Sequence, residues 1–262
     1  MSSIAIVVVT RDRCQALERL LQRLREIEPQ ADEVVVVDNG SVDGTAEMVA
    51  LYPGVRIDVA PGLGLAACRQ RGIDLTSSDI VVMCDDDCVP AANWLAPYVD
   101  AFDARPDLGG AGGEIINIGF EDPRKGRGVL KAHGVYGLVD SPFEATHFGS
   151  ANMALRRSAL TEIGGYDLVF EAGYEEVDLV ERLRKSGWTV EYLPASSVEH
   201  HNVAPNAPRV RRSHHGNVAM RLYLVMKHQR PRSASQWAEL AGHEVRGLYS
   251  DIRGAARLFR KG

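Results

Sequence analysis

The sequence has few cysteines, no long apolar run and no low-complexity tract. Its four cysteines are too few and too irregularly spaced for a disulfide framework. No second cysteine pair or adjacent histidine completes a zinc site around Cys84 and Cys88. We therefore expect four reduced thiols, at Cys14, Cys68, Cys84 and Cys88.

Membrane-spanning and secretion signals are also missing. No stretch of about 18 or more apolar residues occurs, so the sequence predicts no spanning helix. The apolar run at residues 4–9 lacks a basic segment before it and is too short for a secretion signal. We expect a cytoplasmic protein, and leave open a peripheral contact with the inner face of the membrane.

The composition is that of a globular protein, but the charge is divided unevenly. Apolar residues make up 45% and charged residues 25% of the 262 residues, which excludes disordered, collagen-like and coiled-coil classes. Residues 205–262 contain 12 Lys/Arg and 3 Asp/Glu, whereas residues 1–204 contain 18 and 32. An acidic body with a basic tail argues against a nucleic-acid binder. It predicts a body that holds a cation and a tail that faces something anionic.

Short β-branched runs alternate with amphipathic segments in the first half of the chain. We expect strands at residues 4–9, 33–37, 55–59 and 80–84, and helices at about 17–24, 44–51 and 64–75. This alternation predicts an α/β fold with an open, mostly parallel sheet flanked by helices. Such sheets bind their ligands beyond the carboxyl ends of the strands, where the polar clusters of this sequence lie.

The second half gives weaker signals. We expect a helix at about 91–104, a strand at 114–118, regular structure at 150–163, a helix at 176–186 and a strand at 189–193. The Gly-rich run at residues 109–113 is placed before the strand at 114–118. Residues 119–148, rich in Gly, Pro and charge, predict a mobile loop. Two helices, at 213–228 and 235–260, complete the chain.

Three consecutive carboxylates follow the strand at 80–84. Repulsion and burial would raise the pKa values of Asp85, Asp86 and Asp87 unless a cation is present. Alternate residues of an extended segment share a face, so Asp85 and Asp87 point at one divalent ion while Asp86 points elsewhere. Such oxygen ligands suit Mg²⁺ or Mn²⁺. A solvated acidic turn is the alternative, and the position after a buried strand disfavours it.

Two further segments have the chemistry of a nucleotide site. The first, residues 38–41, ends another strand and offers a carboxylate to a nucleobase N–H or a ribose hydroxyl; the alternative is a helix-capping turn. The second, residues 62–64 followed by Arg69 and Arg71, places backbone and guanidinium groups near a diphosphate. No Gly-Lys-Ser/Thr follows, so it is not a Walker loop. It follows the third strand, which disfavours a dinucleotide fingerprint.

The segment at residues 175–178 has three carboxylates before a predicted helix. A carboxylate crowded by others has a raised pKa suited to removing a hydroxyl proton, so this segment is a candidate general base. The alternative is an acidic first turn that complements the helix dipole. His200 and His201 follow the last predicted strand and offer an imidazole to a metal, or are simply surface residues.

In their order along the chain, these segments resemble the family 2 glycosyltransferases of GT-A fold, including bacterial rhamnosyltransferase-like members. The resemblance covers about residues 4–202. It is carried by residues 7–11, 37–45, 62–72, 84–90, 94–95, 149–153, 156–157, 164–167, 175–179 and 198–200.

The resemblance implies inverting transfer of a sugar from a nucleotide diphosphate, most simply UDP or dTDP, to a hydroxyl of a glycan, lipid-linked or natural-product acceptor. By position, Asp38 would read the base N–H and Asp86 would contact the ribose or sugar. Asp87, with Asp85 and His200, would hold Mn²⁺ or Mg²⁺, and His201 is the adjacent candidate. The nucleotide-sugar site implied in this way comprises Thr10, Arg11, Asp38, Asn39, Ser41, Gly64, Arg69, Asp85 and Asp86.

The family position of the catalytic base falls on Glu176. The motif usually reads Glu-Asp and here reads Glu-Glu, so Glu175 and Asp178 stay open as alternatives. Ser150 and Asn152 would border the acceptor, with residues 119–148 closing over the donor to exclude water.

We divide the chain into a GT-A catalytic domain at 1–204 and a basic helical extension at 205–262. Within the catalytic domain, residues 1–105 form the nucleotide-binding half and 106–204 the acceptor-binding half. The basic extension would rest on an anionic membrane or on a second copy in a homodimer; the alternative is packing on this protein's own acidic body.

Two other classes of protein are disfavoured. A sugar-phosphate nucleotidyltransferase would carry a Gly-rich activation loop with Arg and Lys after the first strand, and residues 10–14 contain no glycine. A non-catalytic nucleotide-sugar binder would not need the carboxylates at 85–87 and 175–178.

Overall fold

The computed structural model of the chain describes residues 1–119, 126–170, 173–201, 214–231 and 233–242. The strands of the main sheet are β1 (Ile4–Thr10), β2 (Glu33–Asp38), β3 (Val55–Val59), β4 (Ile80–Asp85), β5 (Cys88–Pro90), β6 (Leu108–Ile118), β10 (Asn152–Arg156) and β11 (Thr189–His201). The helices are α1 (Cys14–Leu24), α2 (Thr45–Val49), α3 (Leu65–Asp74), α4 (Ala96–Ala104), α5 (Arg157–Ile163), α6 (Glu175–Lys185) and α7 (His214–His228).

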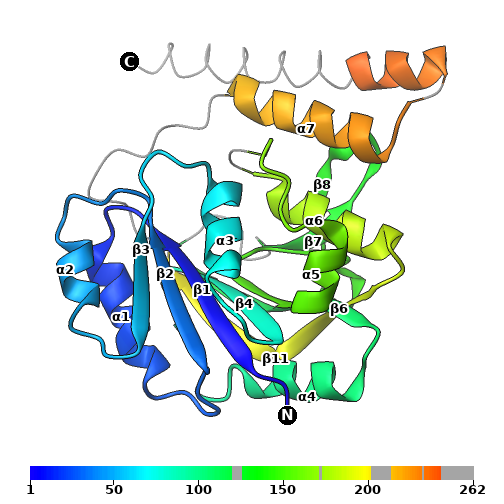
Figure 1. Cartoon of the computed structure of the whole chain (residues 1–262). Helices are drawn as coiled ribbons and strands as arrows, with labels where there is room; N and C mark the ends of the chain where they lie inside the picture. Colours follow the sequence, from blue (N-terminus) through cyan, green and yellow to red (C-terminus); the bar gives the residue numbers. More distant parts are fainter. Residues whose placement is uncertain (120–125, 171–172, 202–213, 232, 243–262) are drawn as a thin grey trace.

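The main sheet has eight strands in the order β3-β2-β1-β4-β10-β6-β11-β5. Strand β1 pairs in parallel with β2 and β4, β2 with β3, and β6 with β11, whereas β10 and β5 pair antiparallel with their neighbours. Six of the eight strands therefore run in one direction (Figure 1). The prediction of an α/β fold with an open, mostly parallel sheet is confirmed.

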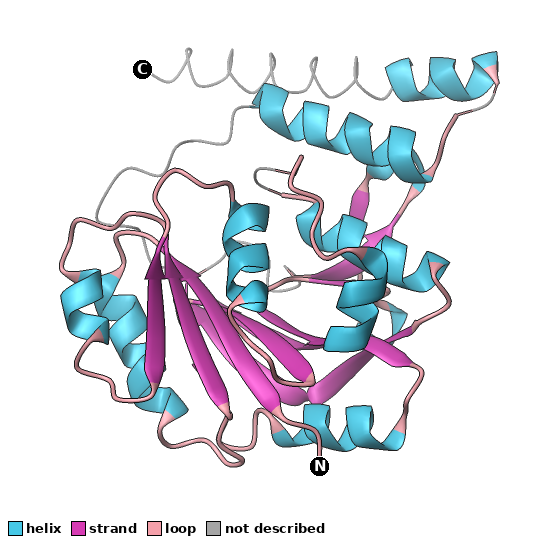
Figure 2. Ribbon diagram, in the orientation of Figure 1, coloured by secondary structure: helices cyan, strands magenta, loops and turns pink. Residues whose placement is uncertain are grey.

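Helices cover both faces of this sheet (Figure 2). Side chains that alternate along β1 point to opposite faces, because successive Cβ atoms of a strand do so. Ile6 and Val8 pack with α1, α2 and α4, whereas Val7 packs with α3, α5 and α6. Burial on both faces explains why these strands read as continuous apolar runs.

The Gly-rich run at residues 109–113 lies inside strand β6, not before it as predicted. A Cβ at Gly112 would lie 2.1 Å from the Phe148 side chain, and one at Gly113 would lie 2.3 Å from the Ser196 carbonyl oxygen. Glycine is needed at these positions because other segments of the same chain approach the strand closely. Strand β11 likewise extends beyond the predicted 189–193, through His201.

The prediction of a mobile loop at 119–148 is wrong for residues 126–148. They form a second sheet, in the order β8-β7-β9, from β7 (Arg127–Leu130), β8 (Tyr136–Leu138) and β9 (His147–Phe148). These strands are two to four residues long, too short to show a periodic pattern. Residues 120–125 lie outside the described part of the chain.

Helix α7 matches the helix predicted at 213–228, and residues 234–242 are helical as well. Figure 1 places α7 beside α6 and β8, and Leu224 packs with Phe170 and Val177. The predicted domain boundary near residue 205 and most of the helix at 235–260 lie outside the described residues. Among the helices that the structure describes, none has the length and apolar character needed to cross a membrane.

Candidate active site

The carboxyl ends of β1, β2 and β4 meet at one edge of the main sheet. Thr10 at the end of β1 lies beside Asp38 at the end of β2, and Val9 lies beside Asp85 at the end of β4. Asp86 and Asp87 follow in the turn that leads to β5. The strand register thus brings together two of the polar segments that the sequence marked, residues 38–41 and 85–87, at the end of β1.

Asp86 is buried and both of its oxygens accept hydrogen bonds. Thr10 Oγ1 donates to Oδ2 at 2.8 Å, and the Arg13 guanidinium donates to Oδ1 at 2.7 Å. Burial raises the pKa of Asp86 to about 7; the charge of Arg13 opposes this rise and the charge of Asp87 adds to it. Asp86 is therefore tied into the protein, where the sequence predicted contact with ribose or sugar.

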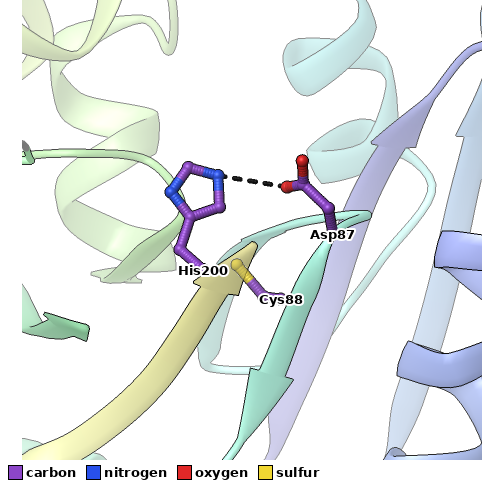
Figure 3. A group of neighbouring side chains, drawn as sticks. All are labelled: Asp87, Cys88 and His200. Carbon is purple, nitrogen blue, oxygen red and sulfur yellow. Dashed lines mark ion pairs between the residues drawn. The ribbon is translucent and has the colours of Figure 1, made fainter. Parts of the chain in front are cut away.

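Asp87 and His200 form the centre of a candidate metal site (Figure 3). Asp87 Oδ1 lies 3.1 Å from His200 Nε2, and Asp85 Oδ2 lies 3.7 Å from the same nitrogen. Although Asp87 Oδ1 is buried, it accepts no hydrogen bond of suitable geometry from any described residue. Both carboxylates thus approach the same imidazole nitrogen, and carboxylate and imidazole ligands of this kind fit Mn²⁺ or Mg²⁺.

Cys88 also lies within ligand distance of this centre, which the sequence analysis missed. Its sulfur and the ligand atoms of Asp87 and His200 all lie within 4.8 Å of one another (Figure 3). The thiol donates to the Ala151 carbonyl oxygen at 3.7 Å, and burial raises its pKa well above the usual value. Because the thiolate is the form that binds metals, Asp85 is the better third ligand.

His201, the alternative to His200, has a different environment. Its ring lies 3.3 Å from Glu199 and is about a third exposed. Its backbone N–H donates to the Asp87 carbonyl oxygen at 2.9 Å. His201 thus helps to hold the turn, while the His200 ring lies against Asp87 in the candidate metal site.

Arg13 is a second residue that the sequence analysis missed. It lies at the start of α1, with a side chain only 9% exposed, and its guanidinium lies 2.7 Å from Asp86 and 2.8 Å from Asp87. Burial would lower the pKa of Arg13, but the charges of Asp86 and Asp87 keep it raised. The available signal was its position in the turn after the first strand, because such turns lie at the carboxyl edge of a parallel sheet.

The loops after β2 and β3 are joined by the residues predicted to bind the nucleotide. Asp38 Oδ1 accepts from the Ser41 N–H at 2.9 Å and from Ser41 Oγ at 2.5 Å. Asn39 and Leu63 exchange two hydrogen bonds, of 2.9 and 3.2 Å, just before Gly64 caps α3. Of the predicted nucleotide residues, Arg11 is the most open, with a side chain 58% exposed.

Arg69 connects the end of β4 to the start of α6. Its guanidinium donates to Glu175 at the start of α6 and lies 3.5 Å from Asp85. Burial would lower its pKa, but the charges of Glu175 and Asp85 raise it. The side chains of Arg69 and Glu175 are 8% and 2% exposed. Arg69 therefore places the first turn of α6 next to the acidic edge of the sheet.

The three candidate bases differ in their environments. Glu175 is buried against Arg69, and Asp178 is fully buried among Arg182, Lys227 and His228 at 2.7–2.8 Å. Glu176 is the least buried of the three. Burial raises the pKa values of three nearby tyrosines, Tyr136, Tyr166 and Tyr174, and the charge of Glu176 raises them further.

The two predicted acceptor residues also differ. Asn152 is fully buried; its Oδ1 accepts from Trp94 and Tyr98, and its Nδ2 donates to the Glu114 and Ser196 carbonyl oxygens. All four of its side-chain hydrogen bonds are thus made within the protein, which corrects its assignment to the acceptor site. Ser150 is buried and its hydroxyl interacts with the Tyr166 hydroxyl. Its contact with an acceptor stays a prediction.

Comparison with known proteins places this site in a family. The family model described as "Glycosyl transferase family 2" matches residues 5–164, more than half of the chain. The chain belongs to glycosyl transferase family 2. It is 27% identical over 232 residues to the N-acetylglucosaminyl-diphospho-decaprenol L-rhamnosyltransferase of Mycobacterium tuberculosis, with 75% of each chain covered. The chain is therefore a glycosyltransferase.

Solved structures give the fold of this family 2 glycosyltransferase. The mannosyltransferase PcManGT from Pyrobaculum calidifontis, in complex with GDP-Man and Mn²⁺, aligns at a TM-score of 0.61 and 18% identity. That alignment covers 97% of this chain and 82% of the other. GalNAc-T7 with UDP, GalNAc and Mn²⁺ aligns at 0.66 and 20% identity over 77% of this chain, which spans 44% of the GalNAc-T7 chain. The predicted GT-A fold is confirmed.

In this family 2 glycosyltransferase, Asp178 stabilises the contact between α6 and α7. Burial alone would raise its pKa, but hydrogen bonds from His228 and Lys227 and the charge of Arg182 lower it to about 2. A carboxyl whose pKa is lowered on folding stabilises the protein above its unfolded-state pKa, and that stability is lost as the pH falls through the folded-state value.

We therefore expect Asp178→Asn to lower the free energy of unfolding by on the order of 2 kcal/mol at pH 7. The difference from the parent protein should shrink as the pH falls from about 4 to about 2. Urea unfolding at several pH values measures it, with Asp100→Asn, on the exposed side of α4, as the control. A penalty that does not change with pH would contradict this account of Asp178.

Proposed function

We propose that this glycosyltransferase is metal-dependent and inverting, and that it moves a sugar from a UDP- or dTDP-sugar to an acceptor hydroxyl. The observation that carries the proposal is the position of Arg69, which contacts both Asp85 and Glu175. One side chain thus joins the metal edge of the sheet to the turn that holds Glu176. The cation ligands and the base lie at the two ends of this short connection.

The donor half supplies binding and charge. When bound at Asp85, Asp87 and His200, the cation would neutralise negative charge on the diphosphate leaving group. Ser41 orients the Asp38 carboxylate by holding Oδ1, so we assign Oδ2 to the nucleobase N–H. UDP and dTDP present one N–H between two carbonyl groups, which suits a single free oxygen. A guanine base presents two adjacent N–H donors, which suit a carboxylate with both oxygens free.

The acceptor half supplies the base. Glu176 takes the proton from the acceptor hydroxyl while the hydroxyl oxygen attacks the anomeric carbon of the donor sugar. The bond from that carbon to the diphosphate oxygen breaks on the opposite face. The product then has the inverted anomeric configuration. We assign this role to Glu176 because it is the most exposed of the three, whereas Glu175 pairs with Arg69 and Asp178 pairs with Lys227 in the interior.

For the acceptor we propose a sugar hydroxyl on a lipid-linked diphosphate. The support is the similarity to the rhamnosyltransferase of M. tuberculosis, whose name includes N-acetylglucosaminyl-diphospho-decaprenol. A basic segment with 12 Lys/Arg and 3 Asp/Glu at residues 205–262 suits the anionic surface where such a substrate lies. Contact of that segment with a second copy is the alternative.

A thermal-shift panel tests the donor and the cation together. We expect a UDP- or dTDP-sugar at about 100 times its Kd, with Mn²⁺, to raise Tm by about 5–10 °C. The same sugar nucleotide with EDTA, and a GDP-sugar with Mn²⁺, should give much smaller shifts. A larger shift with the GDP-sugar would overturn the base assignment, and equal shifts with EDTA would overturn the metal assignment.

A further inference from the structure

We propose that Arg13 tunes the ligand preference of this site: it lowers the affinity for a bare divalent cation and raises the affinity for the nucleotide diphosphate. This inference rests on the metal site proposed above, which uses Asp85, Asp87 and His200. It concerns a residue outside that ligand set, and it predicts effects of opposite sign on two ligands.

Arg13 is fixed in its position by the turn that carries it. The backbone N–H of Asp12 donates to Ser41 Oγ at 2.9 Å, and the N–H of Cys14 donates to Asp43 Oδ2 at 2.9 Å. Asp12 adopts a positive φ of 52°, which turns the chain sharply from β1 into α1. The loop after β2 thus holds both neighbours of Arg13, and its guanidinium stays beside Asp86 and Asp87.

Arg13 and a cation have separate places on Asp87. The guanidinium contacts Oδ2 of Asp87 at 2.8 Å, whereas Oδ1 is the oxygen beside His200. A cation at Oδ1 therefore does not need to displace Arg13. The two positive charges would share one carboxylate that is 2% exposed, where water screens their repulsion poorly.

The charge balance of the site follows from these contacts. Asp85, Asp86, Asp87 and Glu175 contribute four negative charges when ionised, and Arg13 and Arg69 contribute two positive charges. The site without a cation therefore has a net charge near −2, and without Arg13 it would be near −3. Since a cation is attracted by the added negative charge and a diphosphate is repelled by it, removing Arg13 shifts the two affinities in opposite directions.

The test is a pair of binding titrations at pH 8, with Mn²⁺ alone followed by electron paramagnetic resonance and UDP in EDTA followed by calorimetry. For Arg13→Gln we expect about tenfold tighter Mn²⁺ binding and about tenfold weaker UDP binding. Asp86→Asn should do the reverse. The double variant Arg13→Gln/Asp86→Asn removes one charge of each sign, so both affinities should stay within about threefold of the parent protein.

Arg19→Gln is the matched control, because it removes the same charge from an exposed position on the same helix; it should change neither affinity by more than about twofold. If Arg13→Gln does not fold, Asp86→Asn and the double variant still test the charge balance. Mn²⁺ binding that weakens in Arg13→Gln, or equal affinities in Asp86→Asn and the double variant, would overturn the role of Arg13. If neither the parent protein nor any variant binds Mn²⁺, even in the presence of UDP, the proposed metal site is wrong as well.

Discussion

Glu176→Gln is expected to lower kcat about a thousandfold while leaving the KM for the donor within about twofold. Glutamine keeps the size and hydrogen-bonding shape of the side chain but cannot take the proton from the acceptor hydroxyl. Donor binding is assigned to the other half of the site, so it should not change. Steady-state kinetics with a varied donor measures both quantities.

Two related variants separate the role of Glu176 from that of its neighbours. Glu162→Gln, an exposed position on α5, is the matched control and should keep the parent kcat. Glu175→Gln removes the buried partner of Arg69 and should lower Tm as well as kcat. A Glu176→Gln enzyme with the parent kcat would place the base elsewhere.

Asp87→Asn is expected to abolish detectable Mn²⁺ binding and to lower kcat/KM by about a hundredfold or more. Asparagine replaces the carboxylate oxygen beside His200 with a neutral amide group, and it also leaves Arg13 with less opposing charge. Mn²⁺ titration followed by electron paramagnetic resonance measures the binding, and rates at increasing Mn²⁺ measure the activity.

The control for this variant is Asp100→Asn, which removes an exposed carboxylate on α4. The Asp100→Asn enzyme should bind Mn²⁺ and transfer sugar as the parent enzyme does. Full Mn²⁺-dependent activity in Asp87→Asn would show that the cation is held by other residues. A melting temperature close to that of the parent would show that the loss of binding is local.

Much of the first half of the fold could be predicted because its strands are buried on both faces. The β-branched runs of β1, β2 and β4 are short and continuous, and each ends in a polar turn. Since parallel strands end at one edge, the sequence also predicted that Asp38 and Asp85 would come together. The register confirms this, with Thr10 beside Asp38 and Val9 beside Asp85.

The errors of the sequence analysis have a common physical cause, which is contact between distant segments. Position 112, inside strand β6, is a glycine because Phe148 of the second sheet packs against it. Asn152 is a core residue because Trp94 and Tyr98 donate to it. No local pattern around residue 112 or 152 carries that information.

Contacts between distant segments also distinguish the three candidate bases. From the sequence, Glu175, Glu176 and Asp178 were equivalent carboxylates in one helical turn. The structure separates them by their partners, since Arg69 comes from α3 and Lys227 from α7. Helix α7 also shows that part of the basic extension packs on the acidic body, because Lys227 pairs with Asp167 and Asp178.

Transfer followed by nuclear magnetic resonance tests the central claim most directly. The parent enzyme is mixed with a UDP- or dTDP-sugar, Mn²⁺ and a lipid-linked N-acetylglucosaminyl diphosphate, and the anomeric proton of the product is observed. The account predicts a product of inverted configuration, formed with one nucleoside diphosphate per transfer and stopped by EDTA or by Glu176→Gln. A product of retained configuration, or transfer that continues at the same rate in EDTA, would contradict it.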